Sequence, residues 1–357
     1  MTHEFYMKRC IELAKNGLGT TYPNPLVGSV IVHNGKIIGE GWHRKAGEAH
    51  AEVHAVNAVK DKSVLKEATI YVSLEPCSHF GKTPPCCDLI IAHEIPNVVI
   101  GTVDPYAKVA GNGIKKLKES GKNVIVGVLS HECEELNKRF FTFHNKKRPY
   151  IILKWAKTAD GFLAPEKKLQ KAQHDKLKPV WITNQYSRQL VHKWRTEEQA
   201  ILVGTNTVLE DNPKLNARNF SGNNPVRIVL DKSGKISEKY HVKDHSQKTI
   251  FITESEKFIS TENCIYENTI FDNDLVTSIC TILYQHNIQS VIIEGGNITL
   301  TSFITANLWD EARVFEGKTT FKNGTEAPVI IGDVVARFAL LTDEFKIFKN
   351  YDWSNYF

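Results

Sequence analysis

The stretch that decides the fold is His50-Ala51-Glu52, followed after a strand-like run by Pro76-Cys77-Ser78-His79-Phe80-Gly81-Lys82-Thr83-Pro84-Pro85-Cys86. One imidazole and two thiolates are the donors of an open zinc site, in which three protein ligands leave the fourth position to water. We therefore expect His50, Cys77 and Cys86 to bind zinc. Glu52, two residues after the histidine, is the expected proton shuttle for that water.

This pattern is that of the zinc-dependent nucleobase deaminases, whose H-x-E and P-C-x-x-C motifs supply the ligands while the Glu acts as general acid and base. The loop between the two cysteines departs from the P-C-x-x-C motif, because eight residues instead of two separate Cys77 from Cys86. His54 is expected to be structural, since H-A-E-V-H places the glutamate wrongly for a metalloprotease helix. Cys87 could replace Cys86, but a packed thiol is the preferred interpretation.

Length and composition bound the class of protein. A chain of 357 residues suggests two domains, and 41% apolar with 24% charged residues is typical of soluble globular proteins. No apolar run is long enough for a membrane span, and the first residues lack signal-peptide features, so we expect a cytoplasmic protein. Seven cysteines indicate a metal or free thiols. The net charge of +5 does not by itself indicate nucleic-acid binding.

The first half predicts an α/β sheet with helices on both faces. Asn34-Gly35 between two apolar runs is a strong hairpin signal. A helix should begin at His50 and run to about Lys60, with His50 and Glu52 both facing the metal from its first turn. The other expected elements are helices at Glu4–Asn16 and Cys86–His93, and strands at Val27–His33, Lys36–Trp42, Ala68–Leu74, Asn97–Thr102 and Asn123–Val128.

The second half begins after the charged junction Asn145–Pro149, which we take as the boundary between domains 1–146 and 147–357. A helix is expected from Trp181 to Arg195, and Gly295-Gly296 should form a strand-to-helix corner whose backbone N–H groups can hold a phosphate. Residues 321–328 suggest closing β-structure. The expected strands are Tyr150–Ala156, Ala200–Gly204, Val226–Asp231, Thr249–Thr253 and Ser290–Ile293.

Taken together, the two halves resemble a known family, the bifunctional riboflavin-biosynthesis enzymes, in which a pyrimidine deaminase is fused to a ribosyl-side-chain reductase. The similar segments of the first half are P-N-P-L-V-G-S-V from residue 23, H-A-E-V-H-A from residue 50 and L-E-P-C-S-H-F-G-K-T-P-P-C-C-D from residue 74, with the family's long inter-cysteine loop. Those of the second half are L-K-W-A-K-T-A-D-G, W-I-T, A-I-L-V-G-T-N-T-V-L-E-D-N-P-x-L and I-I-E-G-G, from residues 153, 181, 200 and 292.

The resemblance implies a cytidine-deaminase-like three-layer α/β/α domain followed by a dihydrofolate-reductase-like α/β domain. It implies a small-molecule pyrimidine ribose phosphate as substrate, with Zn²⁺ and NADPH as cofactors. His50, Cys77 and Cys86 match the family's zinc ligands, and Glu52 its proton donor. The nicotinamide-nucleotide positions are Ala156, Trp181, Thr207, Asp211 and Gly296, and the substrate positions are Arg195, Leu215, Arg218 and Glu294.

One place departs from the family. A serine that usually precedes the W-I-T tryptophan by two residues is Pro179 here, next to an unusual basic stretch at 167–178. This removes one expected substrate hydroxyl from the wall of the reductase pocket. Lys154 and Asp211 are polar candidates near the sugar, with a surface or turn-capping role as the alternative.

Two rival classes make different predictions. A nucleic-acid-editing deaminase needs a basic groove with stacking aromatic residues and would leave the second half unexplained. A structural zinc module needs a closed site of four ligands. We therefore expect no nucleic-acid and no membrane partner. The sequence leaves open a homo-oligomer, the preference for NADPH over NADH, and transfer of the intermediate between the sites.

Overall fold

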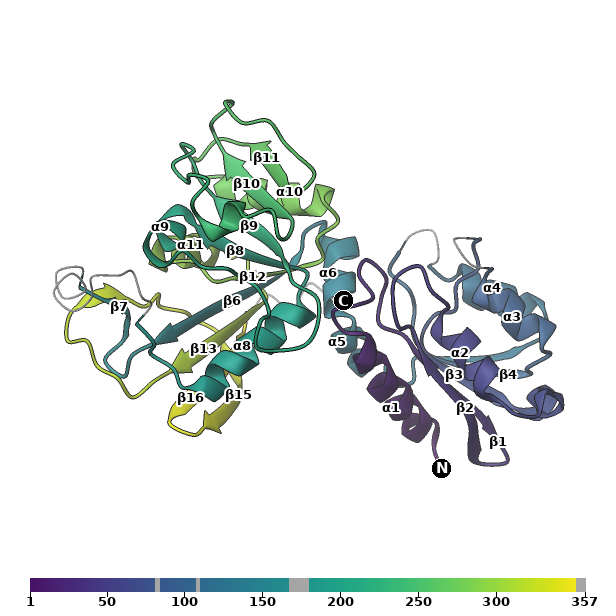
Figure 1. The fold of residues 1–357 in the computed structure, drawn as a ribbon. Helices are drawn as coiled ribbons and strands as arrows, with labels where there is room; N and C mark the ends of the chain where they lie inside the picture. Colours follow the sequence, from purple (N-terminus) through teal and green to yellow (C-terminus); the bar gives the residue numbers. More distant parts are fainter. Residues whose placement is uncertain (81–83, 107–109, 167–179, 351–357) are drawn as a thin grey trace. The chain divides into compact units, whose positions relative to one another are not determined.

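The computed structural model describes residues 1–80, 84–106, 110–166 and 180–350 (Figure 1). The chain divides into two compact units, Met1–Lys147 and Arg148–Phe357. Within the described residues, no helix is both long and apolar enough to cross a membrane. Pro179 and the basic stretch at 167–178 lie outside these residues.

The first unit is built on a five-stranded sheet in the order β2-β1-β3-β4-β5. Asn34 and Gly35 have φ angles of 49° and 73°, so the Asn-Gly pair forms the expected tight hairpin turn. β1 is antiparallel to β2 and β3, whereas β3, β4 and β5 are parallel. The strands are β1 Gly28–His33, β2 Lys36–Trp42, β3 Thr69–Leu74, β4 Asn97–Thr102 and β5 Asn123–Val126.

Helices cover both faces of this sheet, because apolar side chains alternate along its strands. Val30 packs with Met7 of α1 on one face, and Ile31 packs with Val56 of α2 on the other. The unit is therefore the expected three-layer α/β/α fold. Its helices are α1 His3–Ala14, α2 Ala51–Ala58, α3 Cys86–Ala92, α4 Asn112–Glu119, α5 Ser130–Leu136 and α6 Lys138–Lys146, with 3-10 turns η1 Lys15–Gly17 and η2 Lys62–Glu67.

The second unit contains a nine-stranded sheet in the order β11-β10-β9-β8-β12-β6-β13-β16-β15. In this order, neighbouring strands from β11 to β13 are parallel. At the end of the sheet, β16 is antiparallel to both of its neighbours, β13 and β15. The strands are β6 Tyr150–Lys157, β8 Ala200–Gly204, β9 Val226–Leu230, β10 Thr249–Thr253, β11 Cys264–Asn268, β12 Ser290–Ile293, β13 Glu311–Glu316, β15 Asp333–Leu340 and β16 Asp343–Lys349.

This sheet is also covered on both sides. Ile151 packs against Phe303 of α11, whereas its neighbour Ile152 packs against Trp194 of α8, since successive side chains of a strand point to opposite faces. The parallel strands therefore send their carboxyl ends to one edge, where loops and helix N-termini gather. The helices are α8 Gln185–Glu197, α9 Thr205–Asp211, α10 Leu275–Gln285 and α11 Asn297–Thr305, with the 3-10 turn η3 His241–Lys243.

Two expectations for the second unit need correction. The helix expected to begin at Trp181 begins at Gln185, because the side chain of Asn184 caps it by accepting from the N–H groups of Tyr186 and Ser187. The segment expected to close the sheet contains β14 Gly324–Glu326, but this strand pairs with β7 Phe162–Pro165 in a separate two-stranded sheet. The end of the main sheet is formed by β15 instead.

Candidate functional site

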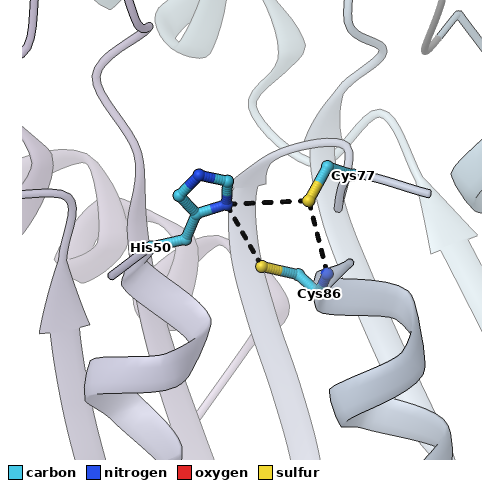
Figure 2. A group of neighbouring side chains, drawn as sticks. All are labelled: His50, Cys77 and Cys86. Carbon is cyan, nitrogen blue, oxygen red and sulfur yellow. Dashed lines mark hydrogen bonds between the residues drawn. The ribbon is translucent and has the colours of Figure 1, made fainter. Parts of the chain in front are cut away.

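Three predicted ligands meet where two helices begin. His50 is the N-cap residue of α2, Cys77 follows β3, and Cys86 is the first residue of α3. The Nδ1 atom of His50 lies 3.6 Å from Cys77 Sγ and 3.3 Å from Cys86 Sγ. The backbone N–H of Cys86 donates to Cys77 Sγ over 3.3 Å (Figure 2). Residues from three elements thus present one nitrogen and two sulfurs to a common point.

The spacing of these atoms fits a zinc ion. Zn–S bonds of about 2.3 Å and a Zn–N bond of about 2.0 Å, at tetrahedral angles, place nitrogen and sulfur about 3.5 Å apart. The two nitrogen–sulfur distances are close to this value, and all three donor atoms lie within 4.8 Å of one another. Three ligands also leave a tetrahedral position for a fourth donor.

The thiols respond in opposite directions to their surroundings. A hydrogen bond from the Cys86 side chain lowers the pKa of Cys77 to about 4, with help from His50 and against the effect of burial. The same hydrogen bond, and then burial, raises the pKa of Cys86. A dication at this point would stabilise both thiolates.

Glu52 lies in the first turn of α2 beside the ligand cluster, and its side chain is buried. Burial raises the pKa of Glu52, and the nearby His50 opposes the shift. A carboxyl group with a raised pKa both accepts and returns a proton near neutral pH more readily than an exposed glutamate. This is the property that a proton shuttle requires.

The neighbouring Cys87 is not part of the cluster. Its thiol is buried and donates to the carbonyl oxygens of Pro76 and Gly113, over 3.3 and 3.6 Å. Burial raises its pKa to about 12, so it stays protonated. Cys87 is thus a packed thiol, as the sequence suggested.

Sequence reasoning gave no role to His43, although it lies beside the cluster. Its ring centroid is 5.3 Å from that of His50, and Asn24 Nδ2 lies 3.0 Å from His43 Nε2. Nδ1 of His43 donates to the carbonyl of Ala49, which leaves Nε2 as the acceptor for the Asn24 amide. The only signal was the P-N-P-L-V-G motif, which contains Asn24 but does not show that it contacts a histidine.

Glu75 was also missed. Its buried carboxylate accepts four backbone N–H groups: those of Asp104 and Gly111 at Oε2, and those of Gly113 and Ile114 at Oε1. Because Glu75 immediately precedes the Pro76-Cys77 pair, this network holds the backbone that carries the ligand Cys77 against the N-terminus of α4. No local sequence pattern indicates these partners.

In the second unit, a buried charge cluster lies at the carboxyl edge of the sheet. Glu294 follows β12, Lys154 lies in β6 and Arg195 in α8. Arg195 binds Glu294 through both carboxylate oxygens, over 3.3 and 2.8 Å, and Lys154 Nζ lies 3.7 Å from Glu294 Oε2. Burial alone would raise the pKa of Glu294, but Arg195 and Lys154 outweigh it and hold the pKa at about 2.

Leu215 and Arg218 belong to the loop that follows α9. Leu215 is buried and has a left-handed φ of 55°. Arg218 is exposed, and its Nη1 donates to Asn216 Oδ1 over 3.1 Å, while Arg195 donates to the carbonyl oxygen of the same asparagine. The loop therefore brings Arg218 close to the charge cluster. Of the expected substrate positions, Arg195 and Glu294 are in direct contact.

The expected nicotinamide-nucleotide positions are more dispersed. Gly296 is the N-cap residue of α11, and a Cβ atom on it would lie 3.9 Å from Thr207 Oγ1 of α9. Ala156 is near the end of β6. Trp181 is exposed and stacks under the guanidinium group of Arg188, and Asp211 ends α9 as an exposed residue. The structure thus places Thr207 and Gly296 side by side. Among the described residues, no recorded contact joins Trp181 or Asp211 to this pair.

Comparisons with known proteins match both units. The cytidine and deoxycytidylate deaminase zinc-binding region matches residues 1–102, and the RibD C-terminal domain matches residues 149–337. The riboflavin biosynthesis protein RibD of Aquifex aeolicus (strain VF5) is 42% identical over 314 residues, covering 87% of this chain and 85% of the relative. That of Bacillus amyloliquefaciens is 38% identical over 355 residues, covering 97% and 90%.

Solved structures agree with this match. A diaminohydroxyphosphoribosylaminopyrimidine deaminase/5-amino-6-(5-phosphoribosylamino)uracil reductase from Thermotoga maritima is 38% identical, has a TM-score of 0.86 and covers 97% of this chain and 98% of its own. Acinetobacter baumannii RibD is 29% identical, with the same TM-score and coverage. With a deaminase-type metal cluster in one unit and a reductase-type domain in the other, the chain belongs to the RibD family of bifunctional deaminase/reductases of riboflavin biosynthesis.

Proposed function

We propose that the first unit deaminates 2,5-diamino-6-ribosylamino-4(3H)-pyrimidinone 5′-phosphate by hydrolysis. The second unit then reduces the ribosyl side chain with NADPH to give 5-amino-6-ribitylamino-uracil 5′-phosphate. The observation that carries the first step is the meeting of His50, Cys77 and Cys86 at zinc-like distances with Glu52 beside them. The activity of the related Thermotoga maritima enzyme supplies the substrate class.

In the deaminase unit, zinc bound by the three ligands would acidify a water molecule toward neutral pH. With the metal bound, Glu52 would be placed to accept a proton from the attacking water as its oxygen adds to the amino-bearing carbon of the pyrimidine. The same carboxyl group then protonates the departing nitrogen, so water and the amine become a carbonyl and ammonia. The buried position of Glu52 excludes bulk water as a competing proton source.

In the reductase unit, NADPH would supply a hydride to C1 of the ring-opened ribose. Lys154 is the better placed of the two polar candidates near the sugar, because its ammonium group lies in the buried cluster with Glu294. Burial lowers the pKa of Lys154, and Glu294 opposes this shift. Such a group can donate the proton that balances the hydride. Asp211 is exposed at the end of α9, which favours a surface role.

The charge of the reductase cluster fits an anionic substrate. Lys154 and Arg195 both contact the carboxylate of Glu294, and Arg218 lies near Arg195, so positive groups outnumber negative ones here. A guanidinium group binds phosphate through two parallel hydrogen bonds, so the arginines suit the 5′-phosphate. This arrangement supports a small phosphorylated substrate. We further propose that the protein has no nucleic-acid partner and works in the cytoplasm.

Steady-state assays test the proposal directly. The full chain should release ammonia from the diaminopyrimidine phosphate without NADPH, and should oxidise NADPH only after deamination. Glu52→Gln keeps the size of the side chain but cannot shuttle a proton, so ammonia release should fall by at least a factor of ~100. Reduction of deaminated substrate should continue.

The control is Glu119→Gln, at an exposed site on α4, which should leave both activities unchanged. Zinc should be retained in both variants. An active Glu52→Gln enzyme would show that another group is the base, and a chain that releases no ammonia at all would refute the first step.

A further inference from the structure

Both oxygen atoms of Asn216 hold side chains of the charge cluster in the second unit. Its backbone carbonyl accepts hydrogen bonds from Nδ1 of His192 over 3.0 Å and from Arg195 over 3.1 Å. Its side-chain Oδ1 accepts from Arg218 over 3.1 Å. One residue therefore links two guanidinium groups from different elements, α8 and the loop after α9.

The loop around Asn216 is fixed from several sides. Leu215 has a φ of 55°, a conformation that is strained for a branched side chain, and it is held there by burial in the core. The guanidinium group of Arg227, itself buried, donates to the carbonyl of Lys214, and Asn224 accepts from the N–H of Ala217. Backbone strain that is maintained by surrounding contacts often marks a functional position.

The positive charges around Asn216 are incompletely compensated. Arg195 already shares Glu294 with Lys154. Within the part of the chain that the structure describes, Arg218 has no ion pair, and partial desolvation of its guanidinium group, together with the neighbouring Arg195, lowers its pKa. His192 adds no charge, because burial, Arg195 and Arg218 lower its pKa to about 4. Two guanidinium groups held near each other are stabilised by an anion that contacts both.

We propose that Asn216 is a positioning residue of the reductase site, which sets the spacing of Arg195 and Arg218 so that both bind one sugar-phosphate group. The inference rests on the proposed reductase function, since that function supplies the phosphate. It adds Asn216 to the residues of the reductase site, although the sequence indicated no role for this residue. The backbone carbonyl fixes Arg195 whatever side chain is present, whereas only the side-chain oxygen fixes Arg218.

Because only the side-chain oxygen is lost on substitution, a single variant separates the two contacts of Asn216. Asn216→Ala keeps the carbonyl and removes only the partner of Arg218, so it should mimic part of the effect of Arg218→Ala. Calorimetric titration of the full chain with ribose 5-phosphate should show binding weakened by about tenfold in Asn216→Ala, the typical effect of losing a hydrogen bond to a charged group. Asn216→Asp should bind more weakly still, because its carboxylate repels the phosphate. Asn219→Ala, at an exposed site three residues on, is the matched control and should bind normally.

A double variant and two substrates separate positioning from stability. Asn216→Ala should cost nothing further in an Arg218→Ala background, since the two residues act as a pair. For NADPH oxidation, Asn216→Ala should raise KM for the phosphorylated substrate by about tenfold, keep kcat within about twofold and leave KM for the dephosphorylated substrate unchanged. Equal losses for both substrates, or additive effects in the double variant, would overturn the inference.

The two levels of the proposal can fail separately. If the wild type oxidises no NADPH but binds ribose 5-phosphate in a manner that depends on Asn216, the reductase function is wrong and the positioning role stands. If the wild type reduces the substrate and Asn216→Ala behaves like Asn219→Ala in both assays, the positioning role is wrong. Absence of ribose 5-phosphate binding to the wild type overturns the positioning role.

Discussion

The adjacent thiols of Cys86 and Cys87 have different roles at the scale of single residues, although they are covalent neighbours. Cys86 points at His50, and Cys87 points at the carbonyl oxygens of Pro76 and Gly113. Metal analysis of the purified chain should therefore give about one zinc per chain, and Cys77→Ser or Cys86→Ser should lose it. Cys87→Ser is the matched control and should keep the metal. Full zinc in both ligand variants would refute the assignment.

Glu294 makes the stability of the second unit depend on pH. Its folded-state pKa of about 2 lies below the ordinary 4.5, because Arg195 and Lys154 stabilise the carboxylate against burial. The contribution is fully present above about pH 4.5, is lost as the pH falls toward 2, and is on the order of 3 kcal/mol. Denaturant unfolding of the wild type and Glu294→Gln should therefore differ most above pH 5 and converge below pH 3.

The exposed Glu119→Gln should follow the wild type throughout this range. A difference between the wild type and Glu294→Gln that stays constant from pH 6 to pH 2 would contradict the depressed pKa of Glu294.

At the scale of elements, the N-terminus of α11 offers a test of cofactor binding that leaves the fold intact. A Cβ atom at Gly296 would meet only Thr207 Oγ1, at 3.9 Å, and the backbone is extended there, so an added side chain is not strained. Gly296→Val should have the melting temperature of the wild type. It should raise KM for NADPH by about tenfold or more, because the added side chain blocks close approach of the phosphates to backbone N–H groups. Ammonia release should not change.

The neighbouring Gly295 is a contrasting position. A Cβ there would lie 2.7 Å from the Cβ of Thr299, so Gly295→Val should reduce the melting temperature as well as NADPH use. Normal NADPH kinetics in a folded Gly296→Val enzyme would show that the cofactor does not approach this corner.

At the scale of the whole molecule, the boundary between the units is marked by Arg148. Its guanidinium group binds the buried Asp310 through two hydrogen bonds of 2.6 and 2.8 Å, and Asp310 also accepts from the N–H of Ile151. Arg148 therefore belongs to the second unit. We predict that residues 1–147 alone release ammonia without NADPH, and that residues 148–357 alone reduce deaminated substrate without zinc.

A fragment that begins at Pro149 is the control for this prediction, because it leaves the Asp310 carboxylate buried without its partner. Loss of one partner from a buried ion pair is costly, so its melting temperature should be lower by on the order of 5 °C or more. If the two longer fragments are folded but inert and regain activity only when mixed, the sites depend on both units together. Sedimentation of the full chain would measure the oligomeric state, which the sequence left open.

The sequence by itself determined the sheet of the first unit and the candidate zinc site. Alternating apolar residues and the Asn34-Gly35 turn specify the hairpin, and each ligand lies at a fixed short distance from the end of a helix or strand. Information of this kind is local, so it can be found without knowing which strands are neighbours. The beginning of α8 was predicted less well, because Trp181 favoured a helix whereas the cap is formed by Asn184.

Only the tertiary structure decided the charge cluster around Glu294 and the partners of Glu75 and His43. Arg195 and Glu294 are 99 residues apart and meet because β12 lies between β6 and β8 in the sheet. That strand order follows from the packing of the whole core, and no periodicity within one segment encodes it. The role of Asn216 depends on the same order, since its hydrogen bonds join α8 to a loop that the sheet alone brings within reach.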